Sequence, residues 1–281
     1  QMGAARSSAR ETGNEYRVSR FFCIFKKSII AEFGGPIGGI VIVMKQKLQC
    51  LFIAVLAIMT PINIWAEIRT GSCGANGDNV KYYLDTDSGE LTIYGSGSMK
   101  GYYYSSPAPY DCYKVKRITI ERGVTTIGRE AFKNCINLTN VTIPGTVTSI
   151  GEEAFAYCEK LSYIYIPESV LSIEDCAFSW CSSLKKLNIS SGSDELELGL
   201  CDYYEDEDYG LFYGCNLEEV YLGRNIKRIS TSYGGWKSPF YQQSKLTTVT
   251  ISNNVTSLSW GSCPAFEGCN NPNSDSWLPL E

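Results

Sequence analysis

The 281-residue sequence contains no histidine. Histidine is the commonest general base near neutral pH and the commonest protein ligand for metals. Its absence excludes Ser-His and Cys-His catalytic pairs and most zinc-hydrolase sites. On composition alone, hydrolysis by a pair of carboxylates and chemistry at a thiolate both stay open.

Basic residues are scarce from Glu67 onward. Of the 25 Lys and Arg, 8 precede Glu67, and of the 30 Asp and Glu, 3 do, which leaves 17 basic and 27 acidic side chains and a net charge of −10. An acidic chain is repelled by nucleic-acid phosphates and by anionic lipid. We therefore expect neither nucleic acid nor a membrane surface as a partner.

A long uncharged run covers 48–66. Lys45 and Lys47 precede it, and the small residue Ala66 ends it before Glu67. This is the order of a secretory signal peptide and its cleavage site. We expect export, removal of 44–66, and a secreted or cell-surface protein that keeps no membrane span.

A permanent membrane helix is the alternative for the same run. It is disfavoured because the run is barely long enough, at ~18 residues, and is interrupted by Pro61. Residues 1–43 show no repeat and no helical period. We interpret them as an unassigned leader that arises from the choice of start site, with translation beginning at Met44.

Beyond residue 113 the sequence repeats every 23 residues, a signature of stacked structural units. Each unit has the form Leu-x-x-Val-x-Ile-Pro-x-x-Val-x-x-Ile-Gly-x-x-Ala-Phe-x-x-Cys-x-x. Its first part favours a short strand that proline ends. The Val-x-x-Ile-Gly part predicts a second extended piece, and the Ala-Phe-x-x-Cys part predicts one helical or 3-10 turn.

Stacked units can bury an apolar face that a single unit cannot, at the ~4.8 Å spacing of neighbouring strands. We expect a mainly β solenoid of about six coils. Before it, 80–84 and 91–93 alternate around DTDSGE and predict a β-hairpin that caps the first coil. The structural core ladder of the solenoid would be Phe132, Cys135, Phe155, Cys158, Phe178 and Cys181.

The recurring AF-x-x-C, the Ile-Pro strand end and the V-T-S-I-G step resemble the BspA-like leucine-rich repeat family over 114–270. The preceding CG…LD…G-x-L-T-I-x-G-x-G-x-M segment is similar to the module often found before such repeats. The resemblance implies a leucine-rich-repeat right-handed superhelix in a bacterial, Bacteroides-type surface protein that acts in adhesion and protein binding and is not an enzyme. The expected domains are a leader (1–43), a signal peptide (44–66), a β capping module (67–113), the repeats (114–270) and a tail (271–281).

The repeated cysteines could be metal ligands, nucleophiles or core residues. Metal sites use closely grouped ligands such as CxxC, whereas these recur every 23 residues, and a buried free cysteine acts as a small hydrophobic residue. We therefore expect no metal and no other cofactor. Cys73 and Cys112 lie off the repeat, and we predict a disulfide between them.

The stretch 194–210 is strongly acidic. Carboxylates are calcium ligands, and two of them could serve a glycosidase. The stretch lacks the EF-hand pattern, and nothing fixes the separation of a carboxylate pair. We interpret it as a solvated loop. The carboxylates that could serve as calcium ligands or as a glycosidase pair are those of Asp202, Glu205, Asp206, Glu207 and Asp208.

In each predicted strand the residues between the inward Leu, Val and Ile positions point outward. Aromatic side chains are favoured in recognition surfaces, while a cross-strand stack that only stabilises the sheet explains tyrosines there equally well. The binding residues expected on this strand face are Tyr163, Tyr165, Lys186, Asn188, Glu219 and Tyr221.

The main functional hypothesis is a secreted or cell-surface protein that binds another protein, or an extracellular-matrix or cell-surface macromolecule, through the strand face. One alternative is a glycan-binding or glycan-degrading accessory protein. Another is a structural spacer, or a fragment of a larger surface protein, with no ligand of its own.

Overall fold

Short strands recur along the chain at the spacing of the sequence repeat. The computed structural model describes residues 67–199, 201–204, 207–228, 238–259, 266 and 269, all within the unit Trp65–Glu281. The predicted leader and signal peptide, 1–66, and the tail, 271–281, lie outside these residues. Among these residues, no helix is long and apolar enough to span a membrane.

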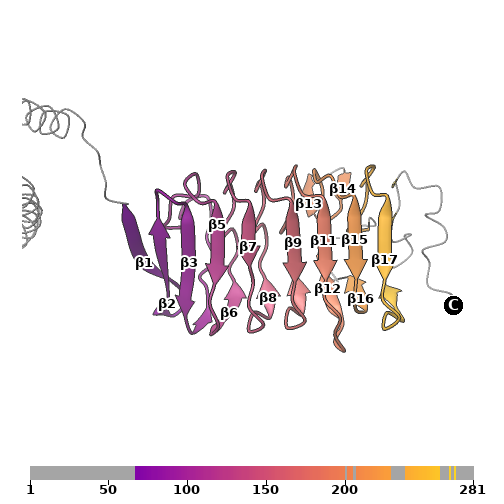
Figure 1. Cartoon of the computed structure of the whole chain (residues 1–281), viewed down its shortest axis with the longest axis horizontal. Coiled ribbons are helices and arrows are strands. Elements are labelled where there is room, and N and C mark those ends of the chain that lie inside the picture. The colour runs from indigo at the N-terminus through magenta and orange to yellow at the C-terminus, as the bar shows by residue number, and fades with distance from the viewer. Residues whose placement is uncertain are drawn as a thin grey trace, which may run out of the picture. The chain divides into compact units, whose positions relative to one another are not determined.

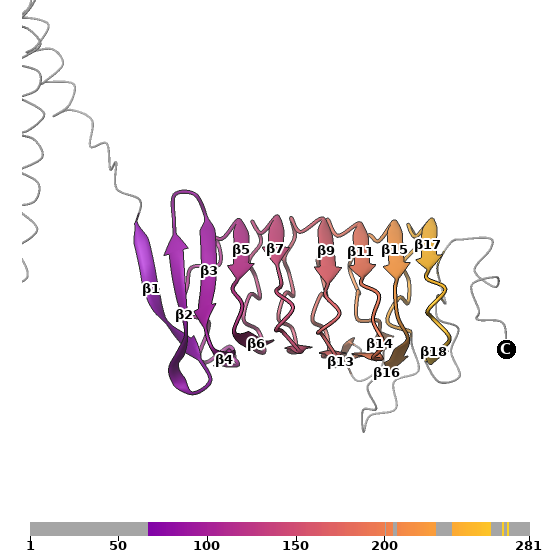
Figure 2. The same ribbon diagram turned by 60° about the horizontal axis from the view of Figure 1, so that its bottom comes forward.

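The strands form two parallel stacks (Figures 1 and 2). The first stack contains β5 (Arg117–Ile120), β7 (Asn140–Thr142), β9 (Tyr163–Ile166), β11 (Lys186–Ile189), β15 (Glu219–Leu222) and β17 (Thr248–Ile251). Its hydrogen-bond ladder is interrupted between β7 and β9. The second stack is a seven-stranded sheet of β4 (Gly97–Ser98), β6 (Val124–Ile127), β8 (Ser149–Ile150), β10 (Ser172–Ile173), β12 (Leu196–Leu198), β16 (Ile226–Arg228) and β18 (Leu258–Ser259).

The two stacks confirm the β solenoid and its two extended pieces per repeat. In β9 the alternation is complete, since Tyr163 and Tyr165 are exposed while Ile164 and Ile166 are buried. This is the period of a strand with one face in the core. Six strands in the first stack, from β5 to β17, agree with about six coils.

An antiparallel meander precedes the repeats. β1 (Ile68–Gly74) pairs with β2 (Gly77–Asp85), and β2 pairs with β3 (Glu90–Gly95) around the predicted turn, so that Tyr82 lies opposite Ile93. Gly89 adopts a φ of +75° in that turn, a conformation that glycine reaches without steric cost. β3 then pairs in parallel with β5 and extends the first stack.

The acidic stretch is not a plain loop, as the sequence had suggested. It contains an antiparallel pair, β13 (Cys201–Tyr204) and β14 (Glu207–Tyr209). Tyrosine has a high strand propensity, which outweighs the mutual repulsion of the acidic residues. The side chains of 201–209 lie outside the described residues, so the proposed calcium and glycosidase carboxylates stay predictions.

The predicted helical or 3-10 turn is wrong, because the return segments of the described coils are β-turns. In one of them, Ala154, Ala156 and Cys158 donate backbone hydrogen bonds to the residue three before each. The alternate residues Glu153, Phe155 and Tyr157 instead donate to Asp175, Ala177 and Ser179 of the next coil. A helix directs every N–H along its own axis, so it could not bond neighbouring coils in this way.

These turns place side-chain-bearing residues in the left-handed region. Tyr157 and Trp180 have φ values of +61° and +60°, and the equivalent residue of a later coil is Gly214, at +74°. In the next coil this position is Gln242, at +60°, and its side chain is exposed. The left-handed conformation costs a non-glycine residue about 1–2 kcal/mol.

We expect Gln242→Gly to raise the free energy of unfolding by about 1 kcal/mol, because the relief of strain exceeds the extra entropy of glycine in the unfolded chain. Urea denaturation measures the change. Gln242→Asn serves as the matched control. Its free energy of unfolding should lie between those of the parent and the glycine variant, since asparagine tolerates this conformation better than glutamine. A glycine variant less stable than the parent would contradict the strain assigned to this turn.

Candidate functional site: the strand face and the Phe-Cys ladder

The repeated phenylalanines form one continuous stack through the core. Consecutive ring centroids are 5.1–5.8 Å apart. Phe132, Phe155 and Phe178 are fully buried, as are Cys135, Cys158 and Cys181. The complete stack is Tyr110, Phe132, Phe155, Phe178, Phe212, Phe240 and Phe266.

The cysteine of each coil binds the stack of the coil before it. Cys158 Sγ donates to the carbonyl of Phe132 at 3.4 Å, and Cys181 Sγ donates to that of Phe155 at 3.1 Å. Burial raises the pKa of the Cys158 thiol well above its ordinary value. A protonated, buried thiol is a poor nucleophile, so Cys158 acts as a packing element.

One coil replaces the ladder cysteine with glutamine. Gln243 is 2% exposed, and its Nε2 donates to the carbonyl of Phe212 at 2.9 Å, as a cysteine thiol does elsewhere. Its Oε1 accepts from the backbone N–H of Leu217 at 3.2 Å. The position therefore requires a hydrogen-bond donor to the preceding phenylalanine carbonyl, and sulfur chemistry is not needed.

The predicted bridge between Cys73 and Cys112 is wrong, because both are free thiols. Cys112 instead lies near Cys135 in the core, and so it extends the ladder into the coil before the first clear repeat. Cys176, which was not part of the predicted ladder, is disulfide-bonded.

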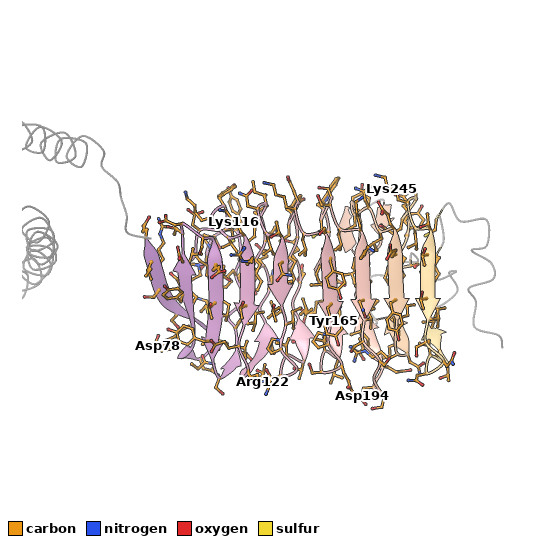
Figure 3. The ribbon with its side chains drawn as sticks, viewed as in Figure 1. Asp78, Lys116, Arg122, Tyr165, Asp194 and Lys245 are labelled. Carbon is orange, nitrogen blue, oxygen red and sulfur yellow. The ribbon has the colours of Figure 1, made fainter. Side chains whose placement is uncertain are left out.

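The outward side chains of the first stack form two rows, and together these rows are the strand face. Figure 3 labels one of its residues, Tyr165. Tyr163 and Tyr165 are 42% and 43% exposed. The first row contains Arg117, Asn140, Tyr163, Lys186, Glu219 and Thr248, and the second contains Thr119, Thr142, Tyr165, Asn188, Tyr221 and Thr250.

Each charged side chain of the first row is paired with a side chain of opposite charge. Lys186 Nζ lies 2.8 Å from a carboxylate oxygen of Glu219, and both side chains are about half exposed. Arg117 makes an equivalent pair with Glu90 at 2.6 Å. Exposed pairs of this kind add little stability. A partner that used the charge of Lys186 or Glu219 would first have to break the ion pair between them.

The second row contains only Thr, Tyr and Asn side chains. The hydroxyl of Tyr221 lies 3.4 Å from Ser191 Oγ, which ties the row to the loop that follows β11. Hydroxyl and amide groups both donate and accept hydrogen bonds. This row can therefore bind through hydrogen bonds and ring contacts, and it contains no carboxylate and no basic side chain.

A second exposed aromatic group, on the return side, was missed at the sequence level. Tyr157 and Trp180 stack at 6.2 Å with nearly parallel rings, and Tyr213 meets Trp180 edge-on at 5.1 Å. Trp180 also covers Gly214, where an added Cβ would lie 2.8 Å from its ring. The ring faces are thus occupied by neighbours, and the group stabilises the turns. The signal in the sequence was an aromatic residue directly before a ladder cysteine, as at Tyr157 and Trp180.

No group of three or more Cys, Asp or Glu side chains able to hold a metal occurs among the residues whose side chains are described. The site residues named from the sequence therefore divide into a buried ladder and an exposed face. The strand face is the candidate site.

The repeat pattern is decisive for the family. A family model for the BspA type leucine rich repeat region matches residues 105–233 and 197–274, with six copies, and so covers more than half of the chain. The chain belongs to the BspA-type leucine-rich repeat family. The Phe-Cys ladder and the strand face are thus features of a BspA-type solenoid.

Several solved leucine-rich repeat structures are similar to this BspA-type chain. A leucine-rich repeat protein from Eubacterium ventriosum is 24% identical, with a TM-score of 0.47, and the match covers 66% of this chain and 45% of that protein. The leucine-rich repeat protein of T. pallidum is 19% identical, with a TM-score of 0.43 and coverages of 71% and 90%.

A leucine-rich cell surface protein from Faecalibacterium prausnitzii is 22% identical, with a TM-score of 0.37 and coverages of 66% and 55%. The BspA-type chain thus spans less than half the length of the Eubacterium protein and about half of the Faecalibacterium protein. No curated protein matches the chain.

Proposed function

We propose that this BspA-type chain is an exported, cell-surface scaffold without enzymatic activity that binds a protein partner through its strand face. The family match supports a repeat scaffold. The signal-peptide pattern of 44–66 supports export. A rigid parallel stack with one polar, exposed face supplies a preorganised surface for a partner.

The observation that carries the proposal is the placement of Tyr163 and Tyr165. They project side by side from β9, and in the pairing with β11 they lie opposite Lys186 and Asn188 rather than another ring. A stabilising cross-strand stack needs aromatic neighbours across the strand pair. These tyrosines have none there, so their exposed rings are available to a partner, and aromatic residues dominate binding energy at interfaces.

The test is the triple variant Tyr163→Ala, Tyr165→Ala, Tyr221→Ala. We expect binding to purified extracellular-matrix proteins, measured by surface plasmon resonance on a defined panel, to weaken at least ~10-fold, because buried interface aromatics are hot spots. Tyr104→Ala is the matched control: Tyr104 is fully exposed in a loop before the repeats, and its loss should leave binding unchanged. If the triple variant binds every panel protein as the parent does, the strand face is not the interface.

Export has its own measurement. N-terminal sequencing of the protein recovered from the cell surface or medium should begin at Glu67. Recovery of residues 1–43 in the exported protein would contradict the start at Met44.

A further inference from the structure

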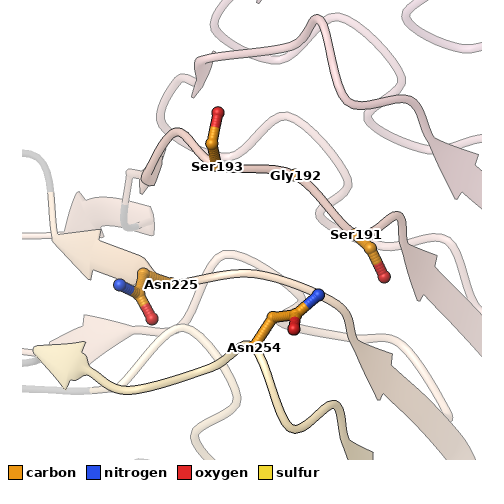
Figure 4. Close-up of a pocket in the computed structure, with 5 residues that line it drawn as sticks. All are labelled: Ser191, Gly192, Ser193, Asn225 and Asn254. Atoms are coloured by element: carbon orange, nitrogen blue, oxygen red, sulfur yellow. The ribbon is translucent and has the colours of Figure 1, made fainter.

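A polar hollow lies at the downstream end of the strand face. Three successive loops that follow β11, β15 and β17 enclose about 520 Å³, within the range of small-molecule sites. Figure 4 shows these loops, with the side chain of Asn254 projecting towards the loop of Ser191. The lining residues are Ser191, Gly192, Ser193, Asn225 and Asn254.

The walls of the hollow are held by contacts between coils. The Asn225 side-chain oxygen accepts the backbone N–H groups of Thr256 at 2.7 Å and Ser257 at 3.1 Å. Gly192 fits between Glu168 and Arg224, and a Cβ at this glycine would lie 2.9 Å from Glu168 Cγ. The loops are therefore fixed in place before any ligand arrives, which lowers the entropy cost of binding.

The lining chemistry favours neutral, polar ligands. The side chains of the described lining residues carry hydroxyl and amide groups, and none of these residues has a carboxylate to hold a cation or a hydrocarbon side chain to receive an apolar group. Arg224, which lies beside Gly192, is fully buried and donates to the carbonyls of Glu168 and Pro167 at 2.6 and 3.1 Å. It cannot reach a phosphate or a carboxylate in the hollow.

An aromatic rim completes the hollow. Tyr221 lies beside Ser191, with their hydroxyls 3.4 Å apart, and Asn188 and Tyr165 continue the same uncharged row. A sugar presents hydroxyls that donate and accept, as Ser, Asn and Tyr groups do, and an apolar C–H face that packs on a ring. We propose that the hollow and this rim form a binding site for a neutral carbohydrate.

The rim residues Tyr165, Asn188 and Tyr221 also belong to the proposed protein interface, but the lining residues of the hollow do not. Its walls are loops beyond the strand ends, and it accepts a free oligosaccharide without any protein partner. The protein-binding proposal can therefore fail while this one holds, and the reverse is also possible.

The experiment uses the full chain and a set of defined, unbranched neutral oligosaccharides (gluco-, manno-, galacto- and xylo-oligomers), with a uronic-acid oligomer and a sulfated oligomer as charged counterparts. Isothermal titration at millimolar sugar measures affinity. We expect at least one neutral oligomer to bind and neither charged oligomer to bind more tightly. The double variant Ser191→Ala, Asn254→Ala should weaken neutral binding ~10-fold through loss of two hydrogen-bonding groups.

Asn253→Ala is the matched control, because Asn253 is an exposed neighbour that does not line the hollow, and it should bind as the parent does. Thermal unfolding followed by circular dichroism checks that the double variant keeps the fold, as expected for two exposed side chains. Three results would each overturn the proposal: no binding of any neutral oligomer, tighter binding of a charged one, or equal binding by the folded double variant.

Discussion

Replacing Phe155 with alanine is expected to lower the free energy of unfolding by about 3–5 kcal/mol. Phe155 is fully buried and its ring stacks between Phe132, at 5.2 Å, and Phe178, at 5.4 Å. Its removal opens a cavity in the middle of the stack, which two adjoining coils cannot fill because their backbones are hydrogen-bonded to each other.

Urea denaturation measures this loss, and Tyr104→Ala supplies the control. Tyr104 is fully exposed, so its truncation should change stability by less than about 0.5 kcal/mol. A repeat protein transmits stability only between neighbouring coils. If Phe155→Ala cost less than about 1 kcal/mol, the phenylalanine stack would be a consequence of the fold and not one of its supports.

The Phe-Cys ladder was predictable because it obeys the 23-residue period wherever the period is clean. Gln243 shows the limit of that inference. It follows Phe240 at the spacing of Cys135 after Phe132, yet a glutamine at a core position reads as a surface residue from sequence. Only the geometry shows that its amide donates to the carbonyl of Phe212, in the role of the thiol.

The return segments could not be assigned from residue types alone. Ala-Phe-x-x-Cys is compatible with a helical turn, since local propensity is similar for a helix and for a run of turns. The choice depends on where alternate N–H groups find acceptors, and in this protein the acceptors belong to the next coil. That information is non-local, which is why the helical expectation failed.

The strand face was located from the alternation in each strand, but its chemistry was not. Lys186 and Glu219 were chosen as binding residues, and their mutual ion pair at 2.8 Å depends on strand register. The polar hollow depends on three loops of different length and on a glycine at position 192, where a side chain would collide with Glu168. Neither feature follows from the repeat.

Arg224 is the clearest feature that the sequence conceals, and its truncation carries the second large expected effect. It lies just after β15 in a coil with an insertion, outside the clean register, where arginine would ordinarily face solvent. Instead it is fully buried, and it crosses Gly192 to donate to the carbonyls of Pro167 and Glu168, two coils away. Burial lowers the pKa of its guanidinium, and the nearby carboxylate of Glu168 opposes that shift.

Arg224→Ala is expected to lower the free energy of unfolding by about 3 kcal/mol in urea denaturation, because it removes two charge-assisted hydrogen bonds and leaves the buried carbonyl of Pro167 without this donor. Arg224→Lys should recover part of the loss, since one ammonium can reach one carbonyl but cannot bridge both. The control is Lys227→Met: this exposed side chain pairs with Glu197 at 2.8 Å, and its loss should cost less than about 1 kcal/mol. Equal effects at Arg224 and Lys227 would show that the buried guanidinium does not hold the coils together, and the loops around the polar hollow would then need another support.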